Sequence, residues 1–184
     1  MSLLDIYDQQ LVEKGLYIQE KRENAIGFFN AIFIPLYKSI SGLTKEDLKI
    51  TYQPSFGNPV NRDNLLKVLK TKRESDLQTG ISSLGPHRDR FFFSLKGRNF
   101  IKTASTGQAR LVSLSLRVSQ ANYIHKTTGI KPILLLDDVL LELDGKKRIL
   151  FIDSLPEYEQ AFFTFLPEEP YKQYLKKEIG RANV

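Results

Sequence analysis

Two adjacent carboxylates are the residues best suited to do chemistry. Asp137 and Asp138 directly follow residues 132–136, a proline, an isoleucine and three leucines. This run is too uniformly apolar for a half-exposed strand and predicts a strand buried on both faces of a parallel sheet. Ligands bind at the carboxyl ends of such strands, and adjacent strand residues point to opposite sides. One acid can therefore face a magnesium ion while the other faces an attacking water, unless the pair only caps the next turn.

A second short string combines a small, flexible turn with the predicted start of a helix. Ser105 and Gln108 are spaced for a capping box, in which their side chains satisfy two free backbone donors. The Ser-Thr-Gly turn between them also presents free amides and the positive end of a helix dipole to an anion. Taken alone, the string is better explained by ordinary capping without function.

Spacing and turn signals predict the elements that position these residues. We expect a helical arm domain over residues 1–78 and an α/β lobe over residues 79–184. The arm has a helical pattern over 3–41, a strand over 48–53, a turn-rich loop over 54–59, and a helix over 62–77 capped by Asn61. The lobe has a hairpin over 90–95 and 99–103, a helix over 107–126 that stops near Gly129, a helix from Gly145 capped by Asp144, and an apolar strand over 160–165.

Composition excludes several classes of site. The 184 residues include no cysteine, so disulfides and thiolate metal sites are excluded, and two histidines make a histidine-rich metal centre improbable. No apolar run approaches the roughly 18 residues of a membrane helix, so we expect a soluble cytoplasmic protein without a membrane partner.

The net charge is +6, and residues 61–110 carry eleven Lys/Arg against four Asp/Glu. This excess predicts a phosphate-rich partner, DNA or nucleotide, with a solvated helix face as the alternative.

The order of these motifs matches the C-terminal half of ABC-type ATPases, and the whole run resembles the RecF family of bacterial DNA replication and repair proteins. The fold that this implies is the C-terminal lobe of an ABC-type ATPase head, a parallel sheet with helices, plus a mainly helical arm. The resemblance is carried by LGPHRD at 84–89, ASTGQAR at 104–110, PILLLDDV at 132–139 with ELD at 142–144, and more weakly by 4–11.

The resemblance implies a role for each motif residue. Asp137 would be the Walker B acid that holds Mg²⁺ through water, and Asp138 would be the catalytic carboxylate that orients the attacking water. Asp144 would lie in the loop that crosses the dimer interface. The signature turn, which in this family contacts the γ-phosphate of ATP held by the opposite subunit, would comprise Ser105, Thr106, Gly107 and Gln108.

The resemblance also implies cofactors and partners. We expect ATP and Mg²⁺, an ATP-dependent head-to-tail homodimer, and binding to duplex DNA near single-strand gaps, together with RecR and RecO to help load RecA. Basic residues between positions 62 and 110 are candidates for phosphate contacts. The alternatives are another ABC-type head, of the SMC-like or overcoming-lysogenisation-defect type, and a non-catalytic interaction scaffold.

The chain departs from the family most clearly by lacking a phosphate loop. The string G-x-x-x-x-G-K-[ST], whose backbone amides and lysine cradle phosphates, does not occur. We therefore expect a truncated sequence whose upstream half carries that loop, and we do not expect the chain to hydrolyse ATP alone.

Smaller departures concern single positions. Arg90 stands where the family usually has a second acid, and Leu141 stands where a small residue is common. Transporter-type ABC proteins place a switch histidine after the last strand, whereas this chain has Thr164, which argues against a transporter. His87 and Arg88 follow a Gly-Pro turn as ordinary polar residues, and we do not expect them to be catalytic.

Overall fold

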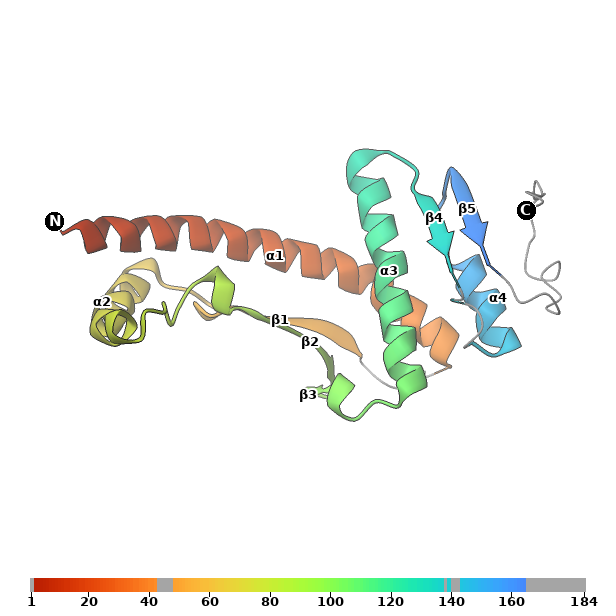
Figure 1. Cartoon of the computed structure of the whole chain (residues 1–184), viewed down its shortest axis with the longest axis horizontal. Coiled ribbons are helices and arrows are strands. Elements are labelled where there is room, and N and C mark those ends of the chain that lie inside the picture. Colours follow the sequence, from red (N-terminus) through yellow and green to blue (C-terminus); the bar gives the residue numbers. More distant parts are fainter. Residues whose placement is uncertain (1, 43–47, 138, 140–142, 165–184) are drawn as a thin grey trace. The chain divides into compact units, whose positions relative to one another are not determined.

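The computed structural model describes residues 2–42, 48–137, 139 and 143–164 (Figure 1). The chain forms two compact units, and both are discontinuous in sequence. The first unit contains Met1–Asn30 and Asp47–Lys102, and the second contains Ala31–Glu46 and Thr103–Val184. Helix α1 (Leu3–Ser41) contributes to both units. The boundary expected after residue 78 divides the chain differently and stays a prediction.

The helices of the first unit pack through a small apolar core. Helix α2 (Arg62–Thr79) begins after Asn61, whose side chain accepts a hydrogen bond from Asn64 N at 2.9 Å, so the predicted cap is confirmed. Gly15 in α1 has a steric purpose, because a Cβ there would lie 2.4 Å from the Phe56 ring. The buried residues of this core are Val12, Leu65 and Leu69, surrounded by Leu11, Leu16, Phe56, Val60, Leu66 and Leu84.

An antiparallel sheet completes the first unit. Its strands β1 (Lys49–Gln53), β2 (Arg90–Leu95) and β3 (Arg98–Asn99) follow one another in space, with β1 paired to β2 from Lys49↔Ser94 to Gln53↔Arg90. The predicted hairpin exists, but the strand expected over 99–103 is wrong, because Phe100–Lys102 forms a 3₁₀ turn, η2. The Asn99 side chain accepts a hydrogen bond from Ile101 N at 3.1 Å, a local bond that competes with extension of the ladder.

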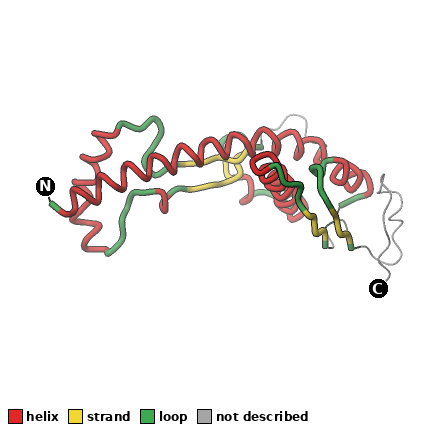
Figure 2. Tube along the Cα trace, turned by 90° about the horizontal axis from the view of Figure 1, so that it is seen from above, coloured by secondary structure: helices red, strands yellow, loops and turns green. Residues whose placement is uncertain are grey.

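The second unit contains the α/β layer. It comprises α3 (Thr106–Thr128), β4 (Ile133–Leu136), α4 (Gly145–Asp153) and β5 (Gln160–Phe163). Strands β4 and β5 are parallel and in register from Ile133↔Gln160 to Leu136↔Phe163, and Figure 2 shows them side by side. The predicted parallel layer is therefore confirmed.

One prediction about this layer is wrong. Residues 132–136 were expected to be buried on both faces, yet Ile133 is 57% exposed and Leu135 is 75% exposed. Phe162, which pairs with Leu135, is 57% exposed as well. Exposed and half-buried residues alternate along both strands of this sheet, so within the described part of the chain one of its faces stays open. An apolar run indicates that a strand is suited to burial, but it does not indicate which part of the protein covers the strand.

The core of the second unit is built mainly from two helices. The last turns of α1 supply Phe33 and Tyr37, whose rings stack with centroids 5.9 Å apart. The other buried residues are Leu36, Ile40, Leu111, Val112, Ser115, Val118, Ser119, Leu143 and Phe151. Within the described residues, no helix is long and apolar enough to cross a membrane.

Candidate functional site

The carboxyl ends of the two parallel strands bring Asp137 and Thr164 together. Thr164 N donates to Leu136 O at 3.2 Å, which continues the pairing of β5 with β4. The Thr164 hydroxyl then donates to Asp137 Oδ1 at 2.9 Å. Asp137 is exposed at the end of β4, as the sequence predicted for a ligand-facing acid. The sequence singles out Thr164 only because it is not a histidine, and no local signal predicts its bond to Asp137.

The environment of Asp137 suits a magnesium ion held through water. Its Oδ1 atom is occupied by the Thr164 hydroxyl, and Oδ2 has no hydrogen bond to any described residue. Mg²⁺ keeps several waters and is usually bound by one or two carboxylates plus substrate phosphates, so a single carboxylate with one free oxygen fits it. Over residues 2–42, 48–137, 139 and 143–164, no three acidic or histidine side chains group into a protein-only metal cage.

Three residues predicted to matter nearby lie outside the described residues. These are Asp138, assigned the catalytic carboxylate, together with Leu141 and Glu142 of the following loop. The role of Asp138 therefore stays a prediction.

The start of α3 is the predicted capping box. Ser105 Oγ accepts a hydrogen bond from Gln108 N at 3.3 Å, and Gln108 Oε1 accepts one from Ser105 N at 2.9 Å. The capping box is confirmed, and in it the Ser105 hydroxyl oxygen and the side-chain carbonyl of Gln108 each accept a hydrogen bond from the other residue's backbone N–H. Whatever this turn binds must therefore meet its remaining donors.

Two backbone amides at this helix start are among the remaining donors, together with the side-chain donors of Ser105, Thr106 and Gln108. The N–H groups of Thr106 and Gly107 are exposed and have no acceptor among the residues that the structure describes. A Cβ placed on Gly107 would meet nothing within 4 Å, and its φ is not in the left-handed region, so the described fold does not require glycine there. A bare backbone lets a ligand approach closely, and the N-terminus of a 23-residue helix favours an anion.

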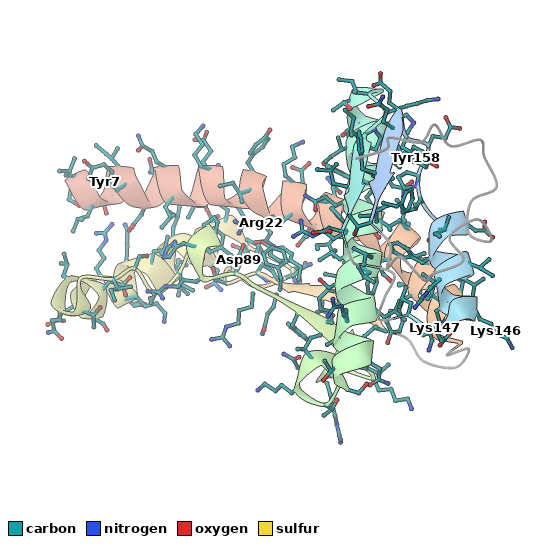
Figure 3. All side chains as sticks on the ribbon, turned by 45° about the vertical axis from the view of Figure 1, so that its right-hand side comes forward. Tyr7, Arg22, Asp89, Lys146, Lys147 and Tyr158 are labelled. Atoms are coloured by element: carbon teal, nitrogen blue, oxygen red, sulfur yellow. The ribbon has the colours of Figure 1, made fainter. Side chains whose placement is uncertain are left out.

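Asp144 is the predicted cap of α4. Its Oδ1 accepts a hydrogen bond from Lys147 N at 3.0 Å and its Oδ2 accepts one from Lys147 Nζ at 2.6 Å (Figure 3 labels Lys147). The hydrogen bond from the Lys147 side chain is the main reason that the pKa of Asp144 lies below its usual range. Within the described part of the chain, no hydrogen bond or ion pair joins Asp144, Asp137 and the Ser105 turn to one another, so the structure presents them as three separate features.

A polar cluster in the first unit surrounds Asp89, the last residue of the string LGPHRD. Its carboxylate side chain is 4% exposed and accepts hydrogen bonds from Arg22 Nη1 at 2.5 Å and Tyr52 OH at 2.5 Å, both on Oδ2. Its Oδ1 accepts from Ser55 N at 2.8 Å. Figure 3 shows Arg22 of α1 beside Asp89. The cluster therefore ties α1, β1 and the loop after β1 to the residue that precedes β2.

The titration of this cluster follows from its geometry. Burial raises the pKa of Asp89, but the hydrogen bonds from Ser55, Tyr52 and Arg22 outweigh burial and leave the pKa below its usual value. Burial, followed by the hydrogen bond to Asp89, raises the pKa of Tyr52 to about 12. The acid is thus held ionised and the phenol protonated, which is the state that keeps every bond in the cluster satisfied.

The rest of the LGPHRD string is structural in the same way. Arg22 Nη1 also donates to Pro86 O at 2.6 Å, and Ser55 Oγ donates to Gly85 O at 2.7 Å. Arg88 Nε donates to Ser82 O at 2.8 Å, within the same loop. The string fixes a loop against α1 and β1. No short-range sequence signal pointed to this, because Arg22 and Asp89 are 67 residues apart.

Comparisons with known proteins identify relatives along nearly the whole chain. The DNA replication and repair protein RecF of Treponema pallidum (strain Nichols) is 43% identical over 174 residues, covering 95% of this chain and 49% of the relative. RecF of Leptospira interrogans serogroup Icterohaemorrhagiae serovar copenhageni is 34% identical over 177 residues, covering 96% of this chain and 47% of that protein. The chain therefore spans about half the length of the curated relatives it matches. No family model matches it.

Solved structures agree in fold. A structure of the recombination mediator protein RecF-ATP in the RecFOR pathway superposes with a TM-score of 0.72 at 31% identity, covering 91% of this chain and 46% of that one. A second RecF structure, described as RecF-ATPrS in the RecFOR pathway, gives a TM-score of 0.71 at 29% identity, with 90% and 46% covered. The mixed helix-and-sheet fold is thus that of an ABC-type ATPase lobe with its arm.

Proposed function

Because the chain belongs to the RecF family and corresponds to its C-terminal portion, we propose that it forms the signature and Walker B part of the ATPase head of a RecF-like DNA replication and repair protein. The observation that carries this proposal is the similarity to proteins named RecF along nearly the whole chain. The exposed Asp137 at a strand end and the two free amides at the start of α3 support it, since both have the chemistry that the family assignment requires.

Different elements of the chain supply the functional groups of the proposed nucleotide site. Asp137 would hold Mg²⁺ through water, and its bond to Thr164 leaves one carboxylate oxygen available for this. Asp138 orients the attacking water. The Thr106 and Gly107 amides, with Ser105 and Gln108 fixing the turn, receive the γ-phosphate of ATP. Bound Mg²⁺ supplies neutralisation of the phosphate charge that develops during in-line transfer.

The phosphate loop must come from elsewhere in the protein. We propose that it lies in the part of the family's length that this chain does not span, and that this chain together with that part makes up the full-length protein. ATP held by the phosphate loop of one subunit would meet the Ser105 turn of the other, in a head-to-tail homodimer with Asp144 at its interface. The chain alone would then hold half of each site and would not hydrolyse ATP.

The proposed nucleic-acid role follows from charge and relatives. Residues 61–110 contain eleven Lys/Arg and four Asp/Glu, and this excess of positive charge suits the phosphate backbone of DNA. We propose that the full-length protein binds duplex DNA next to single-strand gaps and acts with RecR and RecO to promote RecA loading. The pathway named for the solved RecF neighbours supports these partners. An SMC-like head is less well supported, because the reported relatives are named RecF.

ATP-dependent association of the full-length protein tests the proposal. Gly107→Glu places a carboxylate in open space at the start of α3, where the helix dipole favours it, so the fold should be retained. The same carboxylate would repel the γ-phosphate presented by the partner subunit. We expect sedimentation velocity to show ATP-dependent dimers for the wild type and monomers that still bind ATP for the variant.

The matched control is Gly27→Glu, which also adds a carboxylate at an exposed helical glycine with nothing within 4 Å. It should dimerise like the wild type. Dimers of the Gly107→Glu variant as tight as those of the wild type would contradict the assignment of the signature turn.

A further inference from the structure

A long stretch of this chain carries positive charge without any compensating acid. No Asp or Glu occurs between Asp89 and Asp137, while residues 90–136 include eight Lys/Arg. All of these residues are described, so the imbalance can be followed in space. Three of the cations fall close together in the first unit, at and just after the β2–β3 turn: Lys96, Arg98 and Lys102.

The turn that carries the first two cations is a two-residue hairpin turn. Leu95 pairs with Arg98, so Lys96 and Gly97 are the two residues of a tight hairpin, with φ of 50° and 77°. Positive φ at both positions is the type I′ arrangement, which favours Asn-Gly. Lys96 is the one non-glycine residue with positive φ in the described ranges. Because asparagine or glycine suits this position better, the turn geometry does not account for the lysine.

Several other basic residues of the first unit are already neutralised. Arg73 of α2 donates to Asp8 at 2.9 and 2.6 Å and to Asp5 at 2.7 Å, and Lys70 lies 3.7 Å from Asp5. Arg22 is engaged with Asp89. These three cations therefore hold α2 and the residue before β2 against α1.

The hairpin cations differ from those residues in having no partner. Lys96, Arg98 and Lys102 are exposed, and none has a hydrogen bond or ion pair with any residue that the structure describes. Exposed cations without a partner among the described carboxylates produce a local positive potential.

We propose that Lys96, Arg98 and Lys102, the hairpin patch, contact the phosphates of duplex DNA. This inference rests on the proposed DNA-binding function and assigns residues to it. A patch of one charge sign suits a uniformly anionic polymer, whereas protein surfaces carry both signs. Arg98 adds a planar guanidinium that can bind a phosphate in bidentate fashion.

The test measures the salt dependence of DNA binding by the full-length protein in the presence of ATP. A triple variant, Lys96→Asn with Arg98→Gln and Lys102→Gln, removes the patch, and asparagine at position 96 favours the existing turn. Fluorescence anisotropy with a labelled duplex that contains a single-strand gap gives the dissociation constant at several salt concentrations. Log K falls as log salt rises, and each lost phosphate contact makes this negative slope less steep by about 0.9. For the triple variant we therefore expect a slope that is less steep by about 2 to 3. We also expect at least roughly tenfold weaker binding at low salt.

The control removes the same charge from α2, with Arg62→Gln, Lys67→Gln and Lys72→Gln. These residues are exposed and have no ion pair with a described residue. Thermal melting of both triple variants and of Lys96→Asn alone checks the fold, and Lys96→Asn should melt at or above the wild-type temperature.

The outcomes separate the two proposals. A large loss in the hairpin variant and a small loss in the α2 variant would support the patch. Equal losses would overturn it, because net charge alone would then account for binding. Normal DNA binding by the hairpin variant would overturn it while leaving the DNA-binding function intact, and would assign the cations to another anion such as an acidic protein surface. Absence of DNA binding by the wild type would overturn both proposals.

Discussion

Arg22 donates a hydrogen bond to Asp89 at 2.5 Å, and this pair joins the middle of α1 to the residue that precedes β2. The Asp89 side chain is 4% exposed and the Arg22 side chain 33% exposed, so the carboxylate is buried and its partner reaches it from the edge. The last residue of the LGPHRD string is therefore a structural anchor of the first unit. It is satisfied by three separate donors rather than left free for chemistry.

We predict that Arg22→Ala destabilises the protein by about 2 kcal/mol. Removing one partner of a buried pair costs about 3–5 kcal/mol, and we reduce this because Arg22 is partly exposed and Tyr52 and Ser55 remain as donors. Urea denaturation of the full-length protein measures the loss. Lys14→Gln removes a cation from an exposed pair with Glu13 and should change stability little. Equal stability of the two variants would show that the buried pair is unimportant.

We predict an alkaline loss of stability that depends on Tyr52. Its pKa is about 12 in the folded protein, above the value of about 10 in an unfolded chain. A raised pKa stabilises the fold fully below about pH 10, and this contribution is lost as the pH rises from about 10 through 12. The free energy of unfolding is measured from roughly pH 8 to pH 11.5, which begins below this window and covers most of it. Over this range it should fall less in Tyr52→Phe than in the wild type. Identical pH profiles would mean that burial and the hydrogen bond to Asp89 do not raise the pKa of Tyr52.

Local signals made several elements predictable. Helix caps need only a polar residue and its near neighbours, and Asn61, Ser105 and Asp144 all cap the helices that the sequence assigned to them. The apolar run before Asp137 likewise identified a parallel strand and placed the acid at its exposed end.

Features that depend on distant residues were not predictable. The Arg22–Asp89 pair and the Thr164–Asp137 bond span 67 and 27 residues, and no periodicity encodes such distances. The burial expected for Ile133 and Leu135 was wrong because it depends on what covers the sheet. Asp138, the other acid of the pair, lies outside the described residues, so its role remains as the sequence left it.

We predict that Thr164→Val weakens ATP turnover by the full-length protein about tenfold. The hydroxyl orients Asp137 through a 2.9 Å hydrogen bond, and the loss of a group that orients a metal-binding residue commonly costs 10- to 100-fold. Half-saturation of turnover should require more Mg²⁺, which a purely structural change would not cause. Thr71→Val is the control, because the Thr71 hydroxyl bonds only to the backbone of its own helix. An unchanged Mg²⁺ requirement in Thr164→Val would contradict the positioning role.

The central claim is that this chain supplies the Walker B acid and signature turn of a DNA-repair ATPase. ATP turnover by the full-length protein, with and without duplex DNA that contains a single-strand gap, tests it most directly. We predict slow turnover that DNA accelerates and that Asp137→Asn abolishes, while the variant stays folded because Asp137 is exposed. Absence of turnover under both conditions, or full activity in Asp137→Asn, would contradict the claim and favour a non-catalytic scaffold.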